Sequence, residues 1–421
     1  MAEAPVNGAA PARRVAITGI GCITPIGTGP EALWAGLERR ASAVRRIDRF
    51  DASPFRSRIA AQVPDFDATD YLEPKAVKRL DRFAQFSVCA ARLALDDAGL
   101  DPAELEPERV AVQLGSALGG VSYAEEQLGN FLRGGVRAVN PLLALAVYGG
   151  SASSNVALEF GFTGANSTNG MSCASGAVGL GDGWRLIREG SADVVLAGGV
   201  EAPLAPLCYG AFAIIRAMST RNDDPEHASR PFDAGRDGFV MGEGAALLVL
   251  EELEQARARG ARIYAELLGY GTTNDAYHPT APRPDGAQAA RAMRLALQTA
   301  QLQPEQVDYV NAHGSSTALN DSTESRVLRA VLGEHAERVA LSGTKGYHAH
   351  ALGATGAMEA AICALVVQRG WIPPTLNLET PDPECDLPFL RGEGLRRPVY
   401  AALSNSFGFG GINACLAFGA A

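Results

Sequence analysis

Long apolar runs are absent from this sequence of 421 residues. A membrane-spanning helix needs about 20 consecutive apolar residues, and no segment approaches that length. Residues 1–14 are small and polar, and they lack the apolar core of a secretory signal peptide. These absences argue against a membrane protein and against a secreted one. They predict a cytoplasmic protein with a short disordered tail over residues 1–13.

Cysteine is scarce, and its seven residues are scattered along the chain. An odd number without regular spacing argues against a disulfide framework and for a reducing compartment. No spacing of His, Cys or acidic residues matches a metal site, so no metal is expected. Basic residues are fewer than acidic ones, which gives a net charge of −10, and nothing suggests nucleic-acid binding.

Apolar residues and glycine are plentiful: 47% of the residues are apolar and 47 are glycine. A chain of this length can bury a large core and can hold two or three units of ordinary domain size. Strand-like and helix-like segments alternate, which predicts an α/β fold with a seam near residues 257–261. The predicted strands cover residues 15–20, 110–114, 194–197, 245–251, 263–270, 307–311 and 401–404. The predicted helices cover residues 30–38, 76–98, 177–188, 286–300, 321–332 and 356–369.

Cys173 stands just before a helix-like stretch over residues 176–188, after a small polar run. Where a helix begins, unpaired backbone N–H groups and the helix dipole favour a thiolate over a thiol. The pattern therefore predicts an activated nucleophile. Taken alone, the local sequence fits a buried, inert cysteine beside packing glycines at least as well.

Three distant segments favour the nucleophile. His313 follows an apolar strand-like run, so its side chain would face a cleft at the strand end. Lys345 and His350 precede a long helix of small residues, and Phe409 lies in a Gly-Phe-Gly-Gly turn whose amides are unhindered. A cysteine and distant histidines form a catalytic site only if the fold brings them together.

The order of Cys173, His313, Lys345, His350 and the Gly-Phe-Gly-Gly turn resembles that of the β-ketoacyl-[acyl carrier protein] synthases. These are condensing enzymes of the thiolase-like superfamily. The likeness covers nearly the whole chain, and its clearest segments are residues 217–223, 229–233 and 236–244. The chain is most similar to the elongating type with paired histidines, because initiating synthases carry Asn where His350 stands.

The resemblance implies a thiolase-like α/β fold of five layers, αβαβα, built from two similar halves. The first half, residues 14–260, would carry the nucleophilic cysteine. The second half, residues 261–421, would carry both histidines and the gating turn. Internal sequence similarity between the halves is faint, so the duplication is an implication of the resemblance.

The resemblance also implies a decarboxylative condensation in type II fatty acid or related polyketide synthesis. Cys173 would hold an acyl chain, and malonyl-[acyl carrier protein] would extend it by two carbons. The backbone N–H groups of Cys173 and Phe409 would form an oxyanion hole. Neutral His313 and His350 would stabilise the enolate, and Lys345 would help keep them neutral. No cofactor is implied, because acyl and malonyl thioesters arrive on the phosphopantetheine of a separate acyl carrier protein.

Further residues match other positions of the family. Phe409 would be a gate that swings when Cys173 is acylated. The residues expected to bind substrate are Leu118, Phe212, Ser315, Thr317 and Phe407. Leu118 would close the acyl pocket across a dimer interface. The expected supporting acids are Glu359, Asp321 and Glu324, although stabilisation of a helix N-terminus explains the last two equally well.

One segment departs from the family pattern. Residues 346–349 read Gly-Tyr-His-Ala where the family usually has Ser-Met-Thr-Gly. The spacing from Lys345 to His350 is kept, so both functional groups survive. Ala349 makes the backbone less permissive than glycine would. The altered segment suggests a specialised branch with an unusual acyl substrate.

An acidic enzyme needs a local basic face to attract an acyl carrier protein that is itself usually acidic. The candidates for docking the carrier are Lys75, Lys78, Arg79, Arg82 and Arg216. A plain solvated helix face is a rival explanation for these charges. The resemblance to the family implies a twofold homodimer. A heterodimer with a related subunit is the alternative.

Two other functions stay open. A non-catalytic partner subunit, like the chain-length factors of polyketide synthases, would resemble a synthase but typically lacks the nucleophilic cysteine. A thiolase would act on acyl-CoA and normally needs a second catalytic cysteine near the C-terminus. Cys415 lies in an apolar strand-like run, which indicates a structural residue.

Overall fold

One large mixed β-sheet organises the chain, whose residues 13–421 are described by a computed structural model. Its eleven strands follow the order β12-β11-β15-β16-β10-β1-β9-β7-β5-β6, with β2 paired to β1 beside this path. The strands of the first half are β1 (Val15–Thr24), β2 (Gly27–Thr28), β5 (Val110–Gly115), β6 (Asn166–Asn169), β7 (Val194–Glu201) and β9 (Gly244–Glu252). Those of the second half are β10 (Ala265–Asn274), β11 (Tyr309–Asn311), β12 (Ala340–Ser342), β15 (Ala401–Gly408) and β16 (Ile412–Gly419).

The two halves of the sheet repeat one topology. From the outer edge inward, the first half has the order β6-β5-β7-β9-β1 and the second half the order β12-β11-β15-β16-β10, with β2 set aside. When the strands of each half are numbered along the chain, both orders read third, second, fourth, fifth, first. In both halves the third, second and fourth strands are parallel, and the fifth is antiparallel to its two neighbours. A short antiparallel pairing of β1 with β10 joins the halves. This repeat confirms the predicted pair of similar halves.

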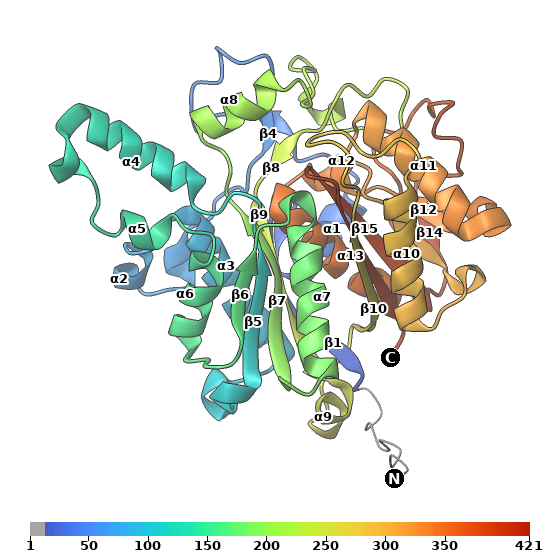
Figure 1. Cartoon of the computed structure of the whole chain (residues 1–421), viewed down its shortest axis with the longest axis horizontal. Coiled ribbons are helices and arrows are strands. Elements are labelled where there is room, and N and C mark those ends of the chain that lie inside the picture. Colours follow the sequence, from blue (N-terminus) through green and yellow to red (C-terminus); the bar gives the residue numbers. More distant parts are fainter. Residues whose placement is uncertain (1–12) are drawn as a thin grey trace, which may run out of the picture.

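Helices form three layers around the two halves of the sheet (Figure 1). In the middle, α7 (Ser175–Arg188) and α13 (Thr355–Arg369) contact each other and strands of both halves. The outer layers are formed by α3 (Arg82–Ala98) and α6 (Ser151–Phe160) on the first half and by α10 (Ala287–Ala300) and α11 (Ala318–Leu332) on the second. The molecule therefore has the αβαβα layers that the resemblance implied.

Glycine at the crossing of α7 and α13 lets the two backbones approach closely. A Cβ at Gly176 would lie 2.9 Å from the backbone nitrogen of Ala357, and one at Gly356 would lie 2.9 Å from that of Ala177. A side chain at either position would push the helices apart. The 3₁₀ turns that lead into the two helices contribute Cys173 and Leu352 to the cavity described below.

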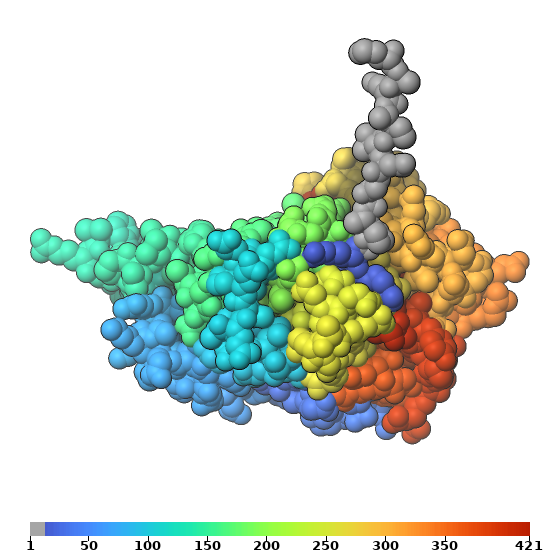
Figure 2. Space-filling model, turned by 90° about the horizontal axis from the view of Figure 1, so that it is seen from below, coloured from blue at the N-terminus to red at the C-terminus, as the bar shows by residue number. Residues whose placement is uncertain are grey.

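The remaining helices and strands complete the fold. They are α1 (Pro30–Glu38), β3 (Arg45–Arg46), β4 (Ile59–Ala61), α2 (Pro74–Val77), α4 (Val121–Gly134), α5 (Leu143–Ala146), α8 (Pro206–Ile214), β8 (Met241–Gly242), α9 (Leu253–Ala258), α12 (Lys345–His348), β13 (Trp371–Ile372) and β14 (Leu395–Arg396). Two views show the segment around α4 projecting from the body of the molecule (Figures 1 and 2). Between residues 13 and 421 no helix is both long and apolar enough to cross a membrane. The predicted tail lies outside the described residues, except for its last residue.

Some predicted elements differ from the observed ones. The helix predicted over residues 76–98 is interrupted between α2 and α3, because Asp81 caps α3 by accepting a hydrogen bond from the backbone N–H of Ala84 at 3.1 Å. The strand predicted over residues 307–311 starts only at Tyr309, since Pro304 opens a 3₁₀ helix just before it. Helices α4, α6 and α8 were not predicted. The seam at residues 257–261 stays a prediction; α9 ends and β10 begins on either side of it.

Candidate active site

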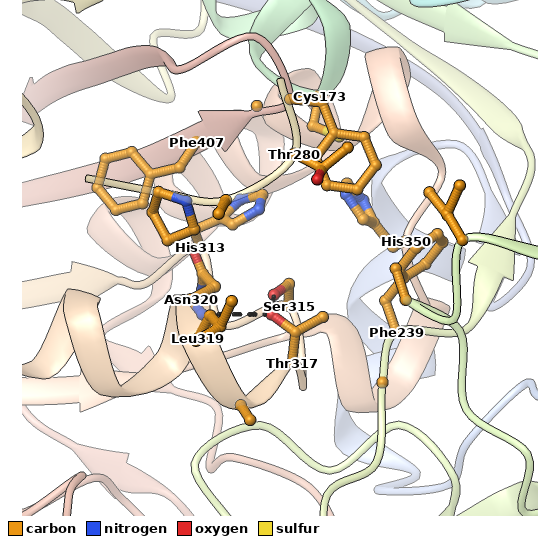
Figure 3. Close-up of a pocket in the computed structure, with 18 of the residues that line it drawn as sticks. Cys173, Phe239, Thr280, His313, Ser315, Thr317, Leu319, Asn320, His350 and Phe407 are labelled. Atoms are coloured by element: carbon orange, nitrogen blue, oxygen red, sulfur yellow. Dashed lines mark hydrogen bonds between the residues drawn. The ribbon is translucent and has the colours of Figure 1, made fainter. Parts of the chain in front are cut away.

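A cavity of about 360 Å³ lies where the two halves of the chain meet, and residues from both halves line it. Cys173, His313 and His350 contribute to its wall (Figure 3), and Phe409 is also part of the lining. The structure thus brings together side chains that lie far apart in the sequence.

Cys173 lies in a 3₁₀ turn, Ser172–Ala174, that leads directly into α7. The predicted position at a helix start is therefore correct, whereas burial opposes the expected ionisation. Burial raises the pKa of the Cys173 thiol, and this outweighs the opposing effects of the Ser172 hydroxyl, the Phe409 backbone and the charge of Lys345. The thiol is the resting form, because the low-dielectric surroundings penalise the thiolate.

The Gly-Phe-Gly-Gly turn connects β15 to β16 and lies against the cysteine. A Cβ at Gly408 would lie only 3.1 Å from the backbone nitrogen of Cys173. The absence of a side chain there lets the backbone N–H of Phe409 approach the sulfur. The ring of Phe409 stacks on Phe212 from α8, with 6.5 Å between the ring centroids.

The two imidazoles face each other edge to face. His313 follows β11 and His350 follows α12, and their ring centroids lie 5.4 Å apart at an interplanar angle of 82°. Burial lowers the pKa of both rings well below the usual value, and the charge of Lys345 lowers it further. Both rings are therefore neutral near pH 7. The Nδ1 atom of His350 lies 2.9 Å from Oγ1 of Thr355.

Neither imidazole should take up a proton between pH 8 and pH 5.5. Because the folded chain keeps these rings neutral while an unfolded histidine protonates near a pKa of about 6.5, acidification below that value favours unfolding through both groups. The measurement is the ¹⁵N chemical shift of the ring nitrogens during a pH titration of the folded protein. A midpoint close to pH 6.5 for either ring would contradict the expectation.

Lys345 is fully buried and anchors the segment that carries His313. Its Nζ donates to Oε1 of Glu359 at 2.6 Å and to the backbone carbonyl of His313, and it lies 3.4 Å from Nδ1 of the same histidine. Burial raises the pKa of the Glu359 carboxyl to about 7, and the Lys345 ammonium opposes that rise. An ammonium only donates hydrogen bonds, so Nδ1 of His313 accepts and its proton resides on Nε2.

The two acids on α11 have different positions. Glu324 accepts hydrogen bonds from the backbone N–H groups of His313 and Gly314, both at 2.8 Å. It therefore fixes the backbone turn that carries the His313 side chain. Asp321 does not line the cavity; it accepts from the backbone N–H of Phe232 at 2.9 Å and lies 3.6 Å from Arg236. Both acids are buried. Asp321 lies in the first turn of α11, as the alternative of helix N-terminal stabilisation requires, whereas Glu324 lies beyond that turn.

The residues expected to bind substrate are only partly assembled in this cavity. Phe212, Ser315, Thr317 and Phe407 line it, and the hydroxyls of Ser315 and Thr317 hydrogen-bond to each other at 2.8 Å (Figure 3). Leu118 is not part of this lining and instead packs in the apolar cluster beside Cys173.

Glu201 was missed by the sequence prediction. Its buried carboxylate accepts from the backbone N–H groups of Ala117 at 2.7 Å and Gly353 at 2.9 Å. It thereby ties the loop before α4 to the turn before α13, and burial raises its pKa to about 7. A lone acid at the end of an apolar strand carries no sequence signal for such a role. Phe239, whose ring centroid lies 5.5 Å from that of His350, was not named among the predicted site residues either.

The proposed carrier-docking residues fall into three groups. Lys75, Lys78 and Arg79 are exposed on and just after α2, and Arg216 is exposed at the cavity, just after α8. Figure 1 shows α2 and α8 in separate parts of the molecule, so these basic residues do not form one patch. Arg82 differs from the others, because it pairs with the buried carboxylate of Glu243 at 3.0 Å. Its side chain is only partly exposed, so it contributes less free surface charge than the others.

Comparison with known proteins places the chain among condensing enzymes. It matches the family models "Beta-ketoacyl synthase, N-terminal domain" over residues 12–256 and "Beta-ketoacyl synthase, C-terminal domain" over residues 264–379. It is 47% identical over 406 residues to the 3-oxoacyl-[acyl-carrier-protein] synthase 2 of Synechocystis sp., which covers 96% of this chain and 98% of the relative. A ketosynthase solved in complex with its type II PKS acyl-carrier protein has a TM-score of 0.91 and 35% identity, covering 97% of this chain and 100% of its own. The solved structure of the ishigamide ketosynthase/chain length factor has a TM-score of 0.91 and 37% sequence identity, and it covers 97% of this chain and 100% of its own. The chain belongs to the beta-ketoacyl synthase family.

Proposed function

We propose that the chain is a β-ketoacyl-[acyl carrier protein] synthase of the elongating type. It condenses a Cys173-bound acyl chain with malonyl-[acyl carrier protein], and it releases CO₂ and a β-ketoacyl thioester that is two carbons longer. The main support is that one cavity holds the Cys173 thiol, the Gly-Phe-Gly-Gly turn and the two neutral imidazoles of His313 and His350. The relative named 3-oxoacyl-[acyl-carrier-protein] synthase 2 supports the same reaction.

The first half-reaction transfers the acyl group to Cys173. The sulfur attacks the carbonyl carbon of the incoming thioester, the bond from that carbon to the carrier's sulfur breaks, and the thiol proton leaves with the carrier thiol. The backbone N–H groups of Cys173 and Phe409 donate to the oxyanion of the tetrahedral intermediate. Burial raises the pKa of the Cys173 thiol. The hydrogen bonds from Ser172 and Phe409 and the charge of Lys345 lower it, and they thereby assist deprotonation.

The second half-reaction uses the two imidazoles. The malonyl thioester loses CO₂, and N–H groups of His313 and His350 donate to the enolate oxygen that forms. The enolate carbon then attacks the acyl carbonyl and expels the Cys173 thiolate, which takes up a proton. The Lys345–Glu359 pair and Glu324 position the His313 turn through the hydrogen bonds described above.

The carrier's phosphopantetheine is part of the substrate, so no resident cofactor is proposed. The hydroxyls of Ser315 and Thr317 are suited to hydrogen-bond its amide groups within the cavity wall. Phe409 stacks on Phe212 and is flanked by glycine, so a swing of its ring would open space beside Cys173. Leu118, in the cluster beside the sulfur, suits the acyl end of the substrate.

A homodimer in the cytoplasm is the proposed state of the enzyme. Four large apolar side chains, Leu128, Phe131, Leu132 and Val136, are exposed on and just after the projecting helix α4 (Figure 2). Burying such a group against a second copy would remove it from water. All seven cysteines are buried and unpaired, which accords with a reducing compartment.

The proposed function is tested by incubating the purified protein with malonyl and acyl carrier proteins. Release of CO₂ together with a lengthened product supports the synthase. A non-catalytic partner subunit would give neither, and a thiolase would use acyl-CoA without releasing CO₂. Cys415 offers no second nucleophile, since it is buried within β16 and does not line the cavity.

Charge reversal on α2 should weaken the use of carrier-bound substrates. We expect Lys75→Glu/Lys78→Glu to raise the KM for acyl carrier protein by roughly 3- to 10-fold, because exposed charge pairs each contribute modestly. The KM for acyl-CoA analogues should not change. Arg291→Glu/Arg396→Glu, at exposed positions on α10 and β14, is the matched control with the same change in net charge. Equal effects on both substrate types would rule out α2 as the docking surface.

A further inference from the structure

The segment between Lys345 and His350 departs from the family pattern and is completely buried. His348 and Ala349 stand where the family usually has Thr and Gly, and neither has exposed surface. Ala349 has a φ of 57° and a ψ of −158°. Glycine adopts this conformation readily, whereas a Cβ disfavours it. The peptide that leads into His350 is therefore strained in this chain.

His348 holds the strained turn through both ring nitrogens. Its Nδ1 lies 2.8 Å from the carbonyl oxygen of Ala349, and it donates there because a carbonyl can only accept. Burial lowers the pKa of His348 to about 3, so the ring is neutral and its Nε2 is an acceptor. That atom lies 3.2 Å from the Thr344 hydroxyl, which is the donor.

The Thr344 hydroxyl also connects His348 to the strand that precedes His313. Nδ2 of Asn311 lies 3.4 Å from Oγ1 of Thr344, and Asn311 ends β11 two residues before His313. A chain of hydrogen bonds thus runs from the strand that carries one imidazole to the peptide that carries the other. The backbone N–H of His350 is held separately, by the carbonyl of Val240 at 2.9 Å.

We propose that His348 is a positioning residue, which braces the strained Ala349 turn and so keeps His350 aligned with His313 for decarboxylation of the malonyl thioester. The inference rests on the proposed function. Two donors that act on one enolate oxygen must be held at a fixed separation, since a small misplacement costs rate. With glycine at position 349 the turn would be relaxed and the brace unnecessary. His348 and Ala349 therefore form a coupled pair.

The test compares the two half-reactions in four proteins: wild type, His348→Phe, Ala349→Gly and the double variant. His348→Phe keeps an aromatic ring and removes both hydrogen bonds. We expect its kcat for CO₂ release from malonyl carrier protein to fall by about 10- to 100-fold. The KM and the rate of Cys173 acylation should change by less than about 2-fold. Ala349→Gly should keep the wild-type kcat, and the double variant should recover to within about 3-fold of it.

The outcomes separate a brace from a general structural role. A parallel loss of acylation and CO₂ release in His348→Phe, or a double variant no better than the single one, would overturn the inference. If His348→Phe fails to fold, Thr344→Val, alone and with Ala349→Gly, gives the same comparison by removing the hydroxyl that links His348 to Asn311. A wild-type protein that acylates Cys173 but releases no CO₂ would instead refute the proposed function.

Discussion

Replacing Cys173 with alanine is expected to abolish condensation. The sulfur is the atom that holds the growing chain, and no neighbouring side chain in the cavity can replace it as nucleophile and leaving group. The rate should fall on the order of 10⁴-fold or more, as when other enzymes lose a covalent nucleophile. Mass spectrometry should find no acyl group on the variant after incubation with acyl carrier protein.

Malonyl decarboxylation should survive in Cys173→Ala. The enolate oxygen is stabilised by His313 and His350. Lys345 and Glu324 hold the backbone of His313, and the backbone N–H of His350 donates to the carbonyl of Val240, so neither position depends on the sulfur. Cys208→Ala is the matched control, since that cysteine is also buried but does not line the cavity. Condensation at the parent rate by Cys173→Ala would refute the assignment of the nucleophile.

Replacing His313 with alanine is expected to separate the half-reactions in the opposite way. Decarboxylation should slow by about 10²- to 10³-fold, because one of the two enolate donors is lost. Acylation of Cys173 should change little, since the oxyanion donors are backbone N–H groups. Lys345 keeps its contacts with Glu359 and with the backbone carbonyl of residue 313, so the site should remain ordered.

The measurement pairs CO₂ release from malonyl carrier protein with the rate of acyl-enzyme formation. His335→Ala is a suitable control, because that ring bonds the backbone carbonyl of Val307, and it does not line the cavity. Full decarboxylation by His313→Ala would remove this histidine from the mechanism. Equal losses in both half-reactions would indicate a structural role.

Long, regular elements could be predicted from the sequence. The helix at α1 has its predicted bounds, and α10 and α13 lie within one residue of theirs, since proline or glycine marks their starts and their ends are followed by a clear change of pattern. The break between α2 and α3 was missed because Asp81 acts as a cap in the middle of an apolar pattern. α6 was missed because serine, a weak helix former, fills its first turns.

The site was predicted unevenly. The reactive residues could be identified because they carry their chemistry in the side chain and keep the family order. Arg82 could not be separated from its neighbours on α2, since its partner Glu243 lies 161 positions away in the chain. Leu118 was assigned to the acyl pocket by resemblance, and in the single chain it packs against the apolar cluster that includes Cys173 but does not line the cavity. Glu201 had no sequence signal at all.

The sequence by itself determined the order of the reactive groups, and through its resemblance to the β-ketoacyl synthases it indicated the fold family and the reaction. The tertiary structure supplied the burial, which raises the pKa of the Cys173 thiol and keeps both imidazoles neutral, as the resemblance implied for the rings. It also decided how the rings are held, through Lys345, Glu324 and His348. Desolvation and hydrogen bonding depend on which groups meet in space, and those groups are contributed by segments that are remote in the chain.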